Sequence, residues 1–400
     1  PASWPDAFAE AARHLAGVAG DRIGAVAGDL CDVESMAALK DLMGALGSAN
    51  LDCRQDGGQL DASRRDFYLF NSGITGIDEV DAILIIGANP RTEAPVLNAR
   101  VRRAWLRGVP IAIIGAAADL TYGARHLGDG PDTLRTLLGG SHEFAKTLKD
   151  AKRPMVILGA AATARGDGAA VLAAAWTLAR DVGAMSEEWH GFNVLHHAAA
   201  RVGALDLGFL PGPGGRGFPQ MMGGGVDVLW LLGADEFNTD RIGRDTFVIY
   251  QGHHGDRGAA RADLILPGAA YTEKHGTYVN TEGRVQRGAQ AIFPPGEARE
   301  DWTIARALSE VMGRTLPYDD LTALRERIEA ANPVFGRIGF LPRFGCIDPT
   351  GPAGGTASFG EAPFRAAFAT YYQTDPISRA SPTMAECVAA LTPPVLAAAE

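Results

Sequence analysis

The sequence predicts an α/β protein with two Rossmann-like, doubly wound lobes followed by a helical and irregular C-terminal extension. Short apolar runs that stop at a glycine or a proline alternate with segments of helical periodicity, which is typical of parallel sheets covered by helices. The pattern also occurs twice, because residues 80–89 (VDAILIIGAN) line up with residues 226–235 (VDVLWLLGAD). The alternative explanation is reuse of strand–glycine turns within one fold class, since glycine alone accepts such turns at no cost.

The expected strands are apolar runs too short to form a buried helix. They cover residues 22–27, 80–86, 110–114, 154–158, 227–232, 246–251 and 262–266. The expected helices repeat apolar residues every three or four positions, and Ser3 is the expected N-cap of the first one. They cover residues 4–18, 32–46, 94–107, 168–182, 301–312 and 320–331.

These elements divide the chain into four expected regions. They are a first Rossmann-like lobe at residues 1–150, a second at residues 151–295, a helical segment at residues 296–331 and an irregular tail at residues 332–400. Because the tail is rich in proline and glycine, we expect it to bury little core of its own. It is expected to lie along the two lobes or along a neighbouring protein.

Composition and charge exclude several classes of function. The formal net charge is -10, the opposite of what phosphate backbones select, so no nucleic acid partner is expected. The longest apolar runs, residues 155–162 and 226–234, are far shorter than the roughly 18 residues of a membrane span, so no direct membrane insertion is expected. The four cysteines stand far apart, which indicates a reducing compartment and gives no iron–sulfur or zinc pattern.

Residues 262–286 concentrate polar chemistry behind a short apolar run. The run, residues 262–266, is expected to be a strand buried on both faces. A polar loop that contains Glu273 follows, and β-propensity then returns before a turn that begins at Asn280. We expect this stretch to pack between the lobes, with Glu273 and Arg284 as internal ion partners.

Two further patterns suggest a binding role, and each has a structural alternative. His253, His254 and Asp256 follow an expected strand, but they would hold a metal only if other loops supplied more ligands. The alternative is a pair of hydrogen-bonded loop histidines. Asn89 follows a strand at the sheet edge where α/β proteins bind ligands, and its alternative role is in a turn before Pro90.

Several blocks of sequence resemble a known family. The first three, residues 262–287, 250–256 (YQGHHGD) and 296–302 (GEAREDW), resemble the molybdopterin oxidoreductase superfamily. Others are similar to one branch of it, the large iron–sulfur subunits of NADH:quinone oxidoreductase, known as respiratory complex I. These are residues 193–196 (NVLH), 204–208 (ALDLG) and 372–381 (YQTDPISRAS). The resemblance implies lobes of the molybdopterin oxidoreductase type.

The resemblance also implies a region without chemistry of its own. In that branch, [2Fe-2S] and [4Fe-4S] clusters lie on an amino-terminal portion that this sequence does not contain, and its start at Pro1 fits a longer polypeptide. The branch keeps the molybdoenzyme fold without the molybdenum cofactor. The sequence after residue 302 has no run of strands for the further cofactor-binding domain of the true enzymes. We therefore expect no catalytic residue, no metal ligand and no cofactor in this stretch.

Five residues mark where the pterin crevice of the wider superfamily would lie. They are Asn89, Asp235, His253, Glu273 and Asn280. We expect them to be remnants of that crevice that bind no cofactor.

The expected function is that of a cofactor-free scaffold in proton-translocating complex I, supporting electron transfer from NADH through iron–sulfur clusters to quinone. The expected partners are the flavin-bearing and iron–sulfur subunits of its peripheral arm. The expected location is the cytoplasmic side of the bacterial inner membrane, equivalent to the mitochondrial matrix side. One alternative is a fragment of a molybdenum or tungsten bis-pterin oxidoreductase, of the formate dehydrogenase or nitrate reductase type. Another is a free-standing nucleotide-binding regulator.

Overall fold

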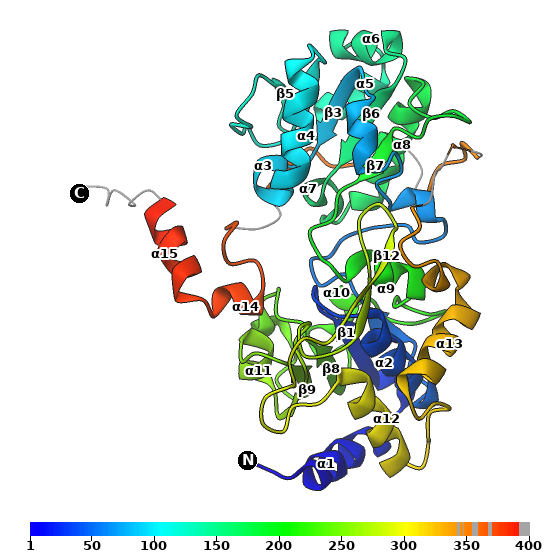
Figure 1. Cartoon of the computed structure of the whole chain (residues 1–400), viewed down its shortest axis with the longest axis vertical. Coiled ribbons are helices and arrows are strands. Elements are labelled where there is room, and N and C mark those ends of the chain that lie inside the picture. The colour runs from blue at the N-terminus through cyan, green and yellow to red at the C-terminus, as the bar shows by residue number, and fades with distance from the viewer. Residues whose placement is uncertain (342–344, 347, 354–358, 367–369, 392–400) are drawn as a thin grey trace.

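A computed structural model describes residues 1–341, 345–346, 348–353, 359–366 and 370–391. Two lobes lie one above the other in Figure 1, and each is built on a five-stranded sheet. We call them the upper and the lower lobe. Within each sheet all neighbouring strands are parallel. The predicted α/β fold with two doubly wound lobes is confirmed.

The lower sheet has the strand order β10-β9-β8-β1-β2 and the upper sheet the order β5-β4-β3-β6-β7. The lower strands are β1 (Ile23–Ala27), β2 (Asn50–Asp52), β8 (Val228–Leu232), β9 (Phe247–Gly252) and β10 (Leu264–Pro267). The upper strands are β3 (Ala82–Ile86), β4 (Ile111–Ile114), β5 (Arg125–Gly128), β6 (Pro154–Leu158) and β7 (Phe192–Val194).

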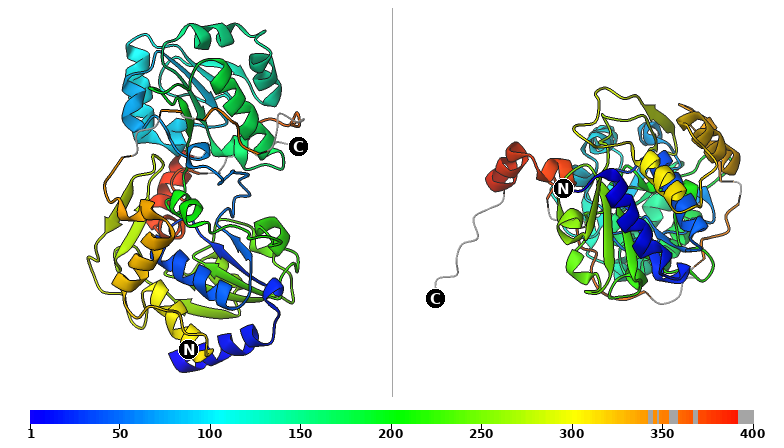
Figure 2. Two further views of the ribbon diagram at one scale, coloured as in Figure 1. Left: turned by 90° about the vertical axis from the view of Figure 1, so that its right-hand side faces the viewer. Right: turned by 90° about the horizontal axis from the view of Figure 1, so that it is seen from below.

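The predicted boundary at residue 150 does not separate the lobes. The lower sheet combines strands from residues 23–52 with strands from residues 228–267, whereas the upper sheet comes entirely from residues 82–194. The upper lobe is therefore an insertion within the lower one, as the separate blue and green strands of the lower lobe in Figure 2 show. Local periodicity predicts the type of each element, but it does not encode which strands pair.

The match between residues 80–89 and 226–235 has a counterpart in the topology. It aligns β3 with β8, and each is the central strand of its sheet, with the next strands in the same order on both sides. A Cβ atom on Gly28 would lie 1.7 Å from the carbonyl oxygen of Gly233, and one on Gly159 would lie 2.4 Å from that of Gly87. Both lobes thus need glycine where the two middle strands end side by side.

Helices cover both faces of each sheet, so the inner strands β1, β3, β6 and β8 are buried on both sides. On β8, Trp230 packs into one core and Leu229 and Leu231 into another. The upper helices are α3 (Pro90–Glu93), α4 (Pro95–Leu106), α5 (Pro131–Leu138), α6 (Glu143–Asp150), α7 (Ala160–Thr163) and α8 (Gly168–Asp181). The lower ones are α1 (Trp4–Ala16), α2 (Val33–Ala45), α9 (Arg201–Leu207), α10 (Phe218–Met221), α11 (Arg257–Arg261), α12 (Asp301–Val311) and α13 (Leu321–Ala331).

The strand expected to be buried on both faces, at residues 262–266, is instead the edge strand β10. It pairs with β9 on one side only, and Ile265 is 51% exposed. A continuous apolar run is typical of a central parallel strand, so its place at the edge could be known only from the strand order.

The hairpin that follows β10 joins the two lobes, as expected. It consists of β11 (Gly276–Val279) and β12 (Val285–Gly288). At one end, the backbone N–H of Thr277 donates to Glu34 on α2, at 2.7 Å. At the other, the hydroxyl of Thr281 donates to the carbonyl oxygen of Val194 on β7, at 3.2 Å.

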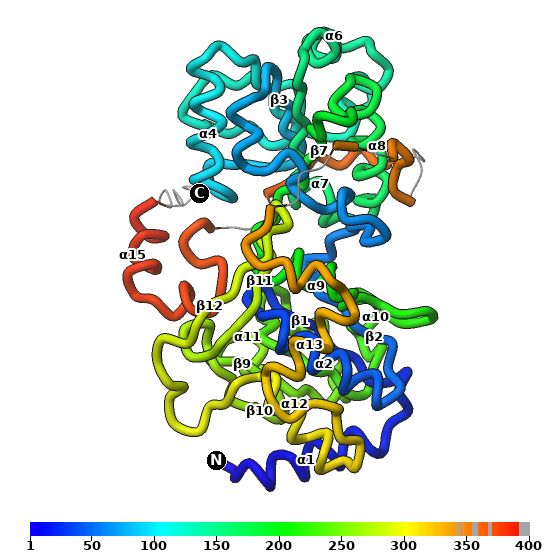
Figure 3. The backbone as a smooth tube through the Cα atoms, turned by 45° about the vertical axis from the view of Figure 1, so that its right-hand side comes forward, coloured from blue at the N-terminus to red at the C-terminus, as the bar shows by residue number. Residues whose placement is uncertain are grey.

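Residues 348–350 of the C-terminal tail lie along the lobes. Arg64 donates to the carbonyl oxygens of Asp348 and Thr350, and the indole of Trp176 donates to that of Pro349. The described part of the tail also contains two short helices, α14 (Pro376–Arg379) and α15 (Pro382–Leu391), in a region expected to be irregular. Figures 1 and 3 both show α15 standing away from the lobes.

Among the described residues, no helix has the length and apolarity that crossing a bilayer requires.

Candidate functional site

The candidate site is the cleft at the carboxyl ends of β1, β8 and β9 in the lower lobe. The chain leaves β1 toward β2 but leaves β8 toward β9, on the opposite side, and α/β proteins bind ligands at such a switch point. A cavity of about 20 Å³ remains there, room for about one water molecule. Its polar lining includes Asp235, Glu236, Gln251, His253, Lys274 and Asp301.

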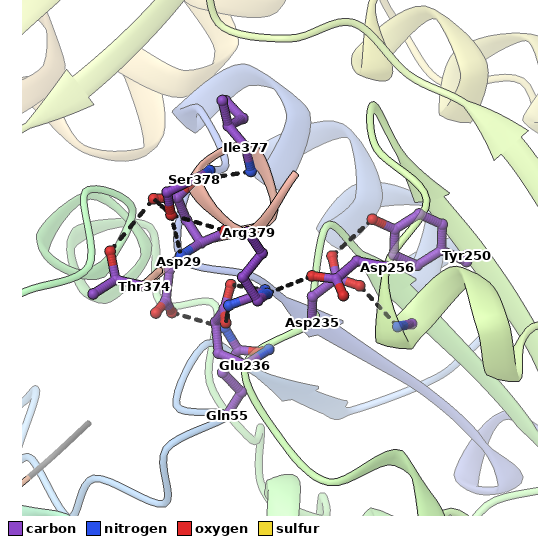
Figure 4. A network of polar contacts seen from close by, with 12 residues as sticks. Asp29, Gln55, Asp235, Glu236, Tyr250, Asp256, Thr374, Ile377, Ser378 and Arg379 are labelled. Carbon is purple, nitrogen blue, oxygen red and sulfur yellow. Dashed lines mark hydrogen bonds and ion pairs between the residues drawn. The ribbon is translucent and has the colours of Figure 1, made fainter. Parts of the chain in front are cut away.

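A side chain from the C-terminal tail enters this cleft. Figure 4 shows Arg379 of α14 reaching between two carboxylates, Glu236 after β8 and Asp256 before α11. Its two terminal nitrogens donate to the two oxygens of Glu236 at 2.6 and 2.9 Å, and Nε donates to Asp256 at 2.6 Å. Pro376 of the same helix also lines the cavity. The tail therefore closes the cleft from outside.

Asp235, one of the expected crevice residues, lies beneath Arg379 and is fully buried. It accepts hydrogen bonds from the hydroxyl of Tyr250, at 2.7 Å, and from the backbone N–H of Gly258, at 2.8 Å. Both of its oxygens are thus engaged in holding β9 and the start of α11 together.

Arg379 bonds to two carboxylates, Glu236 and Asp256, and two more, Asp29 and Asp235, lie close to Glu236. Burial raises the pKa of Glu236 to about 7, and the bonds from Arg379 offset this only in part. Burial also raises the pKa of Asp235. For Arg379, burial would lower the pKa, but the bonds to Glu236 and Asp256 outweigh it and raise the pKa.

A second buried charge group lies on the inner side of the cavity and centres on Lys274. Its Nζ lies 2.7 Å from Asp32, the N-cap of α2, and also contacts Asp301 at the start of α12. The side-chain amide of Gln251 donates to Asp301 at 2.9 Å. Burial would lower the pKa of Lys274, but the charges of Asp301 and Asp32 outweigh it and raise that pKa.

The predicted ion pair between Glu273 and Arg284 is wrong. Glu273 accepts a hydrogen bond from the backbone N–H of Ala270 at 2.9 Å, within its own turn. Arg284 lies instead 3.3 Å from Glu282, across the tip of the β11–β12 hairpin. The buried cation of this stretch is the neighbouring residue Lys274, because the loop turns that side chain inward.

Of the other expected crevice residues, the structure brings only His253 to the cavity beside Asp235. Burial lowers the pKa of His253 to about 4, and the charges of His254 and Lys274 add to this effect. Asn89 lies in the upper lobe, where its side chain caps α3 by accepting from Arg91. Asn280 lies at the hairpin turn and accepts from the backbone N–H of Arg284.

Within the described part of the chain, no three His, Cys, Asp or Glu side chains are arranged to hold a metal ion. This includes His253, His254 and Asp256. The Nδ1 atoms of the two histidines lie 2.7 Å apart, and Asp256 is engaged by Arg379.

A larger groove of about 760 Å³ lies between the lobes and the tail. Its charged lining is balanced, with three carboxylates and three guanidinium groups. They are Asp56, Asp167, Glu236, Arg165, Arg241 and Arg365. Arg165 bonds to Asp167 and to the carbonyl oxygen of Ala362 in the tail.

Sequence reasoning assigned no role to Lys274, Asp32, Asp301 or Arg379. Asp301 and Arg379 lie in blocks that carried the family resemblance, residues 296–302 and 372–381. Their position in these blocks is the one feature of the sequence that could have indicated a role for them. Their partners lie far away in the sequence, so no local pattern indicated them.

Solved structures with a similar fold are distant in sequence. The formyltransferase/hydrolase complex FhcABCD of Methylorubrum extorquens contains a chain with a TM-score of 0.56 and 16% identity, covering 78% of this chain and 96% of that one. Acetylene hydratase of Pelobacter acetylenicus matches with a TM-score of 0.54 and 14% identity, covering 85% of this chain and 64% of its own. These likenesses show the fold alone.

Sequence relatives are closer. The chain is 43% identical over 415 residues to the mitochondrial NADH-ubiquinone oxidoreductase 78 kDa subunit of Neurospora crassa, covering 98% of this chain and 53% of that protein. It is 41% identical over 398 residues to the mitochondrial NADH dehydrogenase [ubiquinone] iron-sulfur protein 1 of Solanum tuberosum, covering 97% and 52%. The chain thus spans about half the length of these relatives.

Family models agree with the resemblance seen in the sequence. The model for the C-terminal part of the NADH-ubiquinone oxidoreductase G subunit matches residues 349–387, which include Arg379. The model for molybdopterin oxidoreductase matches residues 1–311, and with them both sheets and the cleft. The predicted resemblance is confirmed, and the chain belongs to the molybdopterin oxidoreductase family.

Proposed function

We propose that this chain is a cofactor-free scaffold region of the peripheral-arm iron–sulfur subunit of proton-translocating NADH:quinone oxidoreductase, complex I. It supports electron transfer from NADH through iron–sulfur clusters to quinone without reacting itself. The proposal draws support from relatives at 41–43% identity over nearly the whole chain. Because the chain spans about half of those proteins, the [2Fe-2S] and [4Fe-4S] clusters are expected in an amino-terminal portion of the full subunit.

One observation carries the cofactor-free part of this proposal, and it is the closure of the lower cleft by the tail. Ligand pockets usually enclose about 300–1,000 Å³, and this cavity of about 20 Å³ does not fit a pterin dinucleotide. The polar atoms that would meet such a ligand are engaged by Arg379, Tyr250 and backbone N–H groups.

The groove between the lobes is large enough for a small molecule, so its volume alone does not argue against a ligand. Its charges do argue against an anionic pterin dinucleotide. Its three guanidinium groups are matched by three carboxylates, and Arg165 is bonded to Asp167, so the described lining is not the positively charged surface that binds phosphates.

Exposed apolar side chains favour contacts with other subunits. Phe293 is 87% exposed and Ile292 is 58% exposed, on the loop after β12. Neighbouring apolar side chains that are exposed on a protein surface often mark a site of contact with another protein. We propose the flavin-bearing and iron–sulfur subunits of the peripheral arm as partners. The subunit would then lie on the cytoplasmic side of the bacterial inner membrane, or on the matrix side in mitochondria.

Metal and pterin analysis of the purified full-length protein tests the proposal. We expect iron and acid-labile sulfide, less than a stoichiometric amount of molybdenum or tungsten, and co-purification with flavin- and cluster-bearing subunits. One molybdenum or tungsten per chain together with pterin would contradict the scaffold and support the bis-pterin oxidoreductase alternative.

A further inference from the structure

The segment from Thr370 to Leu391 is bonded to the lower lobe by Arg379 of α14, and Pro376 of the same helix lines the cleft. Pro376 is its one buried residue among those described, and α15 has no buried residue. Figure 2 shows α15 projecting sideways from the molecule when it is seen from below. Such a segment gains little apolar burial, so its attachment depends on the polar contacts of α14.

Those contacts are concentrated on one side chain. Arg379 makes the three hydrogen bonds to Glu236 and Asp256 described above, and its side chain is only 16% exposed. A bidentate guanidinium–carboxylate pair combines charge with fixed geometry, so it acts as the central contact of a small interface.

The segment also keeps its shape by local bonds. Asp375 caps α14 by accepting from the backbone N–H groups of Ile377 and Ser378, each at 2.9 Å. The backbone N–H of Asp375 donates to the hydroxyl of Ser378 at 3.1 Å, which completes a capping box. That hydroxyl also donates to the Asp375 carboxylate at 2.9 Å. A short peptide with these residues therefore carries the bonds that shape this turn.

The cleft, in turn, is built for a cation. Without Arg379, Glu236 and Asp256 would lose the guanidinium between them, with the carboxylates of Asp29 and Asp235 close by. Two buried cations nearby already have partners, because Lys274 is shared between Asp32 and Asp301 and Arg201 is paired with Asp56. The cleft thus selects a guanidinium and disfavours anions.

We propose that this cleft is a binding site for an arginine-bearing peptide, that residues 370–391 fill it within the same chain, and that they leave it reversibly. A second copy of the same peptide can then take their place. The site is a feature of the chain that stands whether or not complex I is the assembly to which it belongs.

The test uses the full-length protein and a fluorescein-labelled synthetic peptide of residues 370–391, with binding followed by fluorescence anisotropy. In the unchanged protein the tethered segment competes at a high effective concentration, so the labelled peptide binds weakly. In the Arg379→Gln protein the tethered segment loses its central contact, and the peptide is expected to bind at least about tenfold more tightly.

Two controls make this result specific. The Arg365→Gln protein changes an exposed tail arginine outside α14, and it is expected to bind the peptide as weakly as the unchanged protein. A peptide that carries Arg379→Gln is expected to bind neither protein. Failure of the Arg379→Gln protein to bind the unchanged peptide, or equal binding of both peptides, would overturn the proposal.

Hydrogen exchange of the unchanged protein gives an answer even if the Arg379→Gln protein does not fold. The backbone N–H groups of Arg379 and Ala380 are hydrogen-bonded within α14. We expect them to exchange at least a hundredfold faster than those of the central strand β8, because the segment opens by itself. Exchange of α14 as slow as that of β8 would show that the segment does not leave, and would overturn the proposal.

Discussion

At the scale of single residues, Lys274 holds together parts of the lower lobe that are far apart in the sequence. It contacts Asp32 at the start of α2 and Asp301 at the start of α12, and all three side chains are buried. Two carboxylates share one ammonium group, and Ser35 and Gln251 donate further hydrogen bonds to them. The group is stable because each buried charge has a partner of opposite charge or a hydrogen-bond donor.

Replacing Lys274 with methionine should destabilise the protein by about 3–5 kcal/mol, because Asp32 and Asp301 then remain buried without a cation. Urea unfolding followed by tryptophan fluorescence measures this as a lower midpoint. The control is Arg13→Met, which breaks an exposed pair with Glu10 on α1 and should leave the midpoint unchanged. An unchanged midpoint in the Lys274→Met protein would mean that the carboxylates are solvated or protonated.

The ionisation of Glu236 should make stability depend on pH. Its pKa is about 7 in the folded protein against an ordinary value of 4.5, because burial disfavours the charged form. The folded chain therefore binds more protons than the unfolded chain between these values, and this residue's contribution to stability falls as pH rises from about 4.5 to about 7.

We expect the Glu236→Gln protein to lose that part of the pH dependence. Urea midpoints measured at pH 5 and pH 7.5 check this against Glu326→Gln, which changes an exposed carboxylate on α13. The difference between the two midpoints should shrink in the Glu236→Gln protein alone. The same difference in all three proteins would mean that Glu236 titrates at its ordinary value.

At the scale of elements, each lobe depends on the close approach of its two middle strands. Gly28 and Gly233 directly follow β1 and β8, and Gly159 and Gly87 directly follow β6 and β3. Gly233 and Gly87 also have positive φ angles of 55° and 61°, which favour glycine. In the sequence, the glycine after each strand indicates only where the strand stops. In the structure, it is also required for the two middle strands to pair.

Gly28→Ala should therefore disrupt the lower lobe. Its Cβ atom would lie 1.7 Å from the carbonyl oxygen of Gly233, so β1 and β8 would have to separate. We expect a large loss of soluble protein and of its thermal midpoint. Gly166→Ala is the matched control, because its Cβ atom would meet no atom within 4 Å. Equal solubility and equal midpoints for the two variants would contradict this account of the strand ends.

At the scale of the whole molecule, the sequence predicted elements well and their partners poorly. The predicted strands, the predicted helices and the Ser3 cap follow from local periodicity and local hydrogen bonds, and they are confirmed. The short strands β2, β5 and β7 were not predicted, and α14 and α15 lie where an irregular tail was expected. The pairing of β1 with β8 and the contacts of Arg379 depend on pairs of residues 123 or more positions apart, and the edge position of β10 depends on the order of the whole sheet. The expected crevice residues divide in the same way, since Asp235 and His253 meet while Asn89 lies in the other lobe.

Because the upper lobe is inserted within the lower one, the choice of fragment should decide whether a fragment of the chain folds. Residues 61–198 contain all five strands of the upper sheet, whereas residues 1–150 contain two strands of the lower sheet and only three of the upper one. A fragment can bury its sheet only if the central strands have both neighbours, so we expect residues 61–198 to fold and residues 1–150 to remain unfolded or aggregate.

Circular dichroism on heating checks this prediction, with the full-length protein as the reference. The fragment of residues 61–198 should melt cooperatively, below the midpoint of the full-length protein, because it loses contacts such as that of Thr281 with Val194 on β7. The fragment of residues 1–150 should show no cooperative transition. A cooperative melt of residues 1–150 together with an unfolded 61–198 fragment would restore the boundary at residue 150 and contradict the strand order of both sheets.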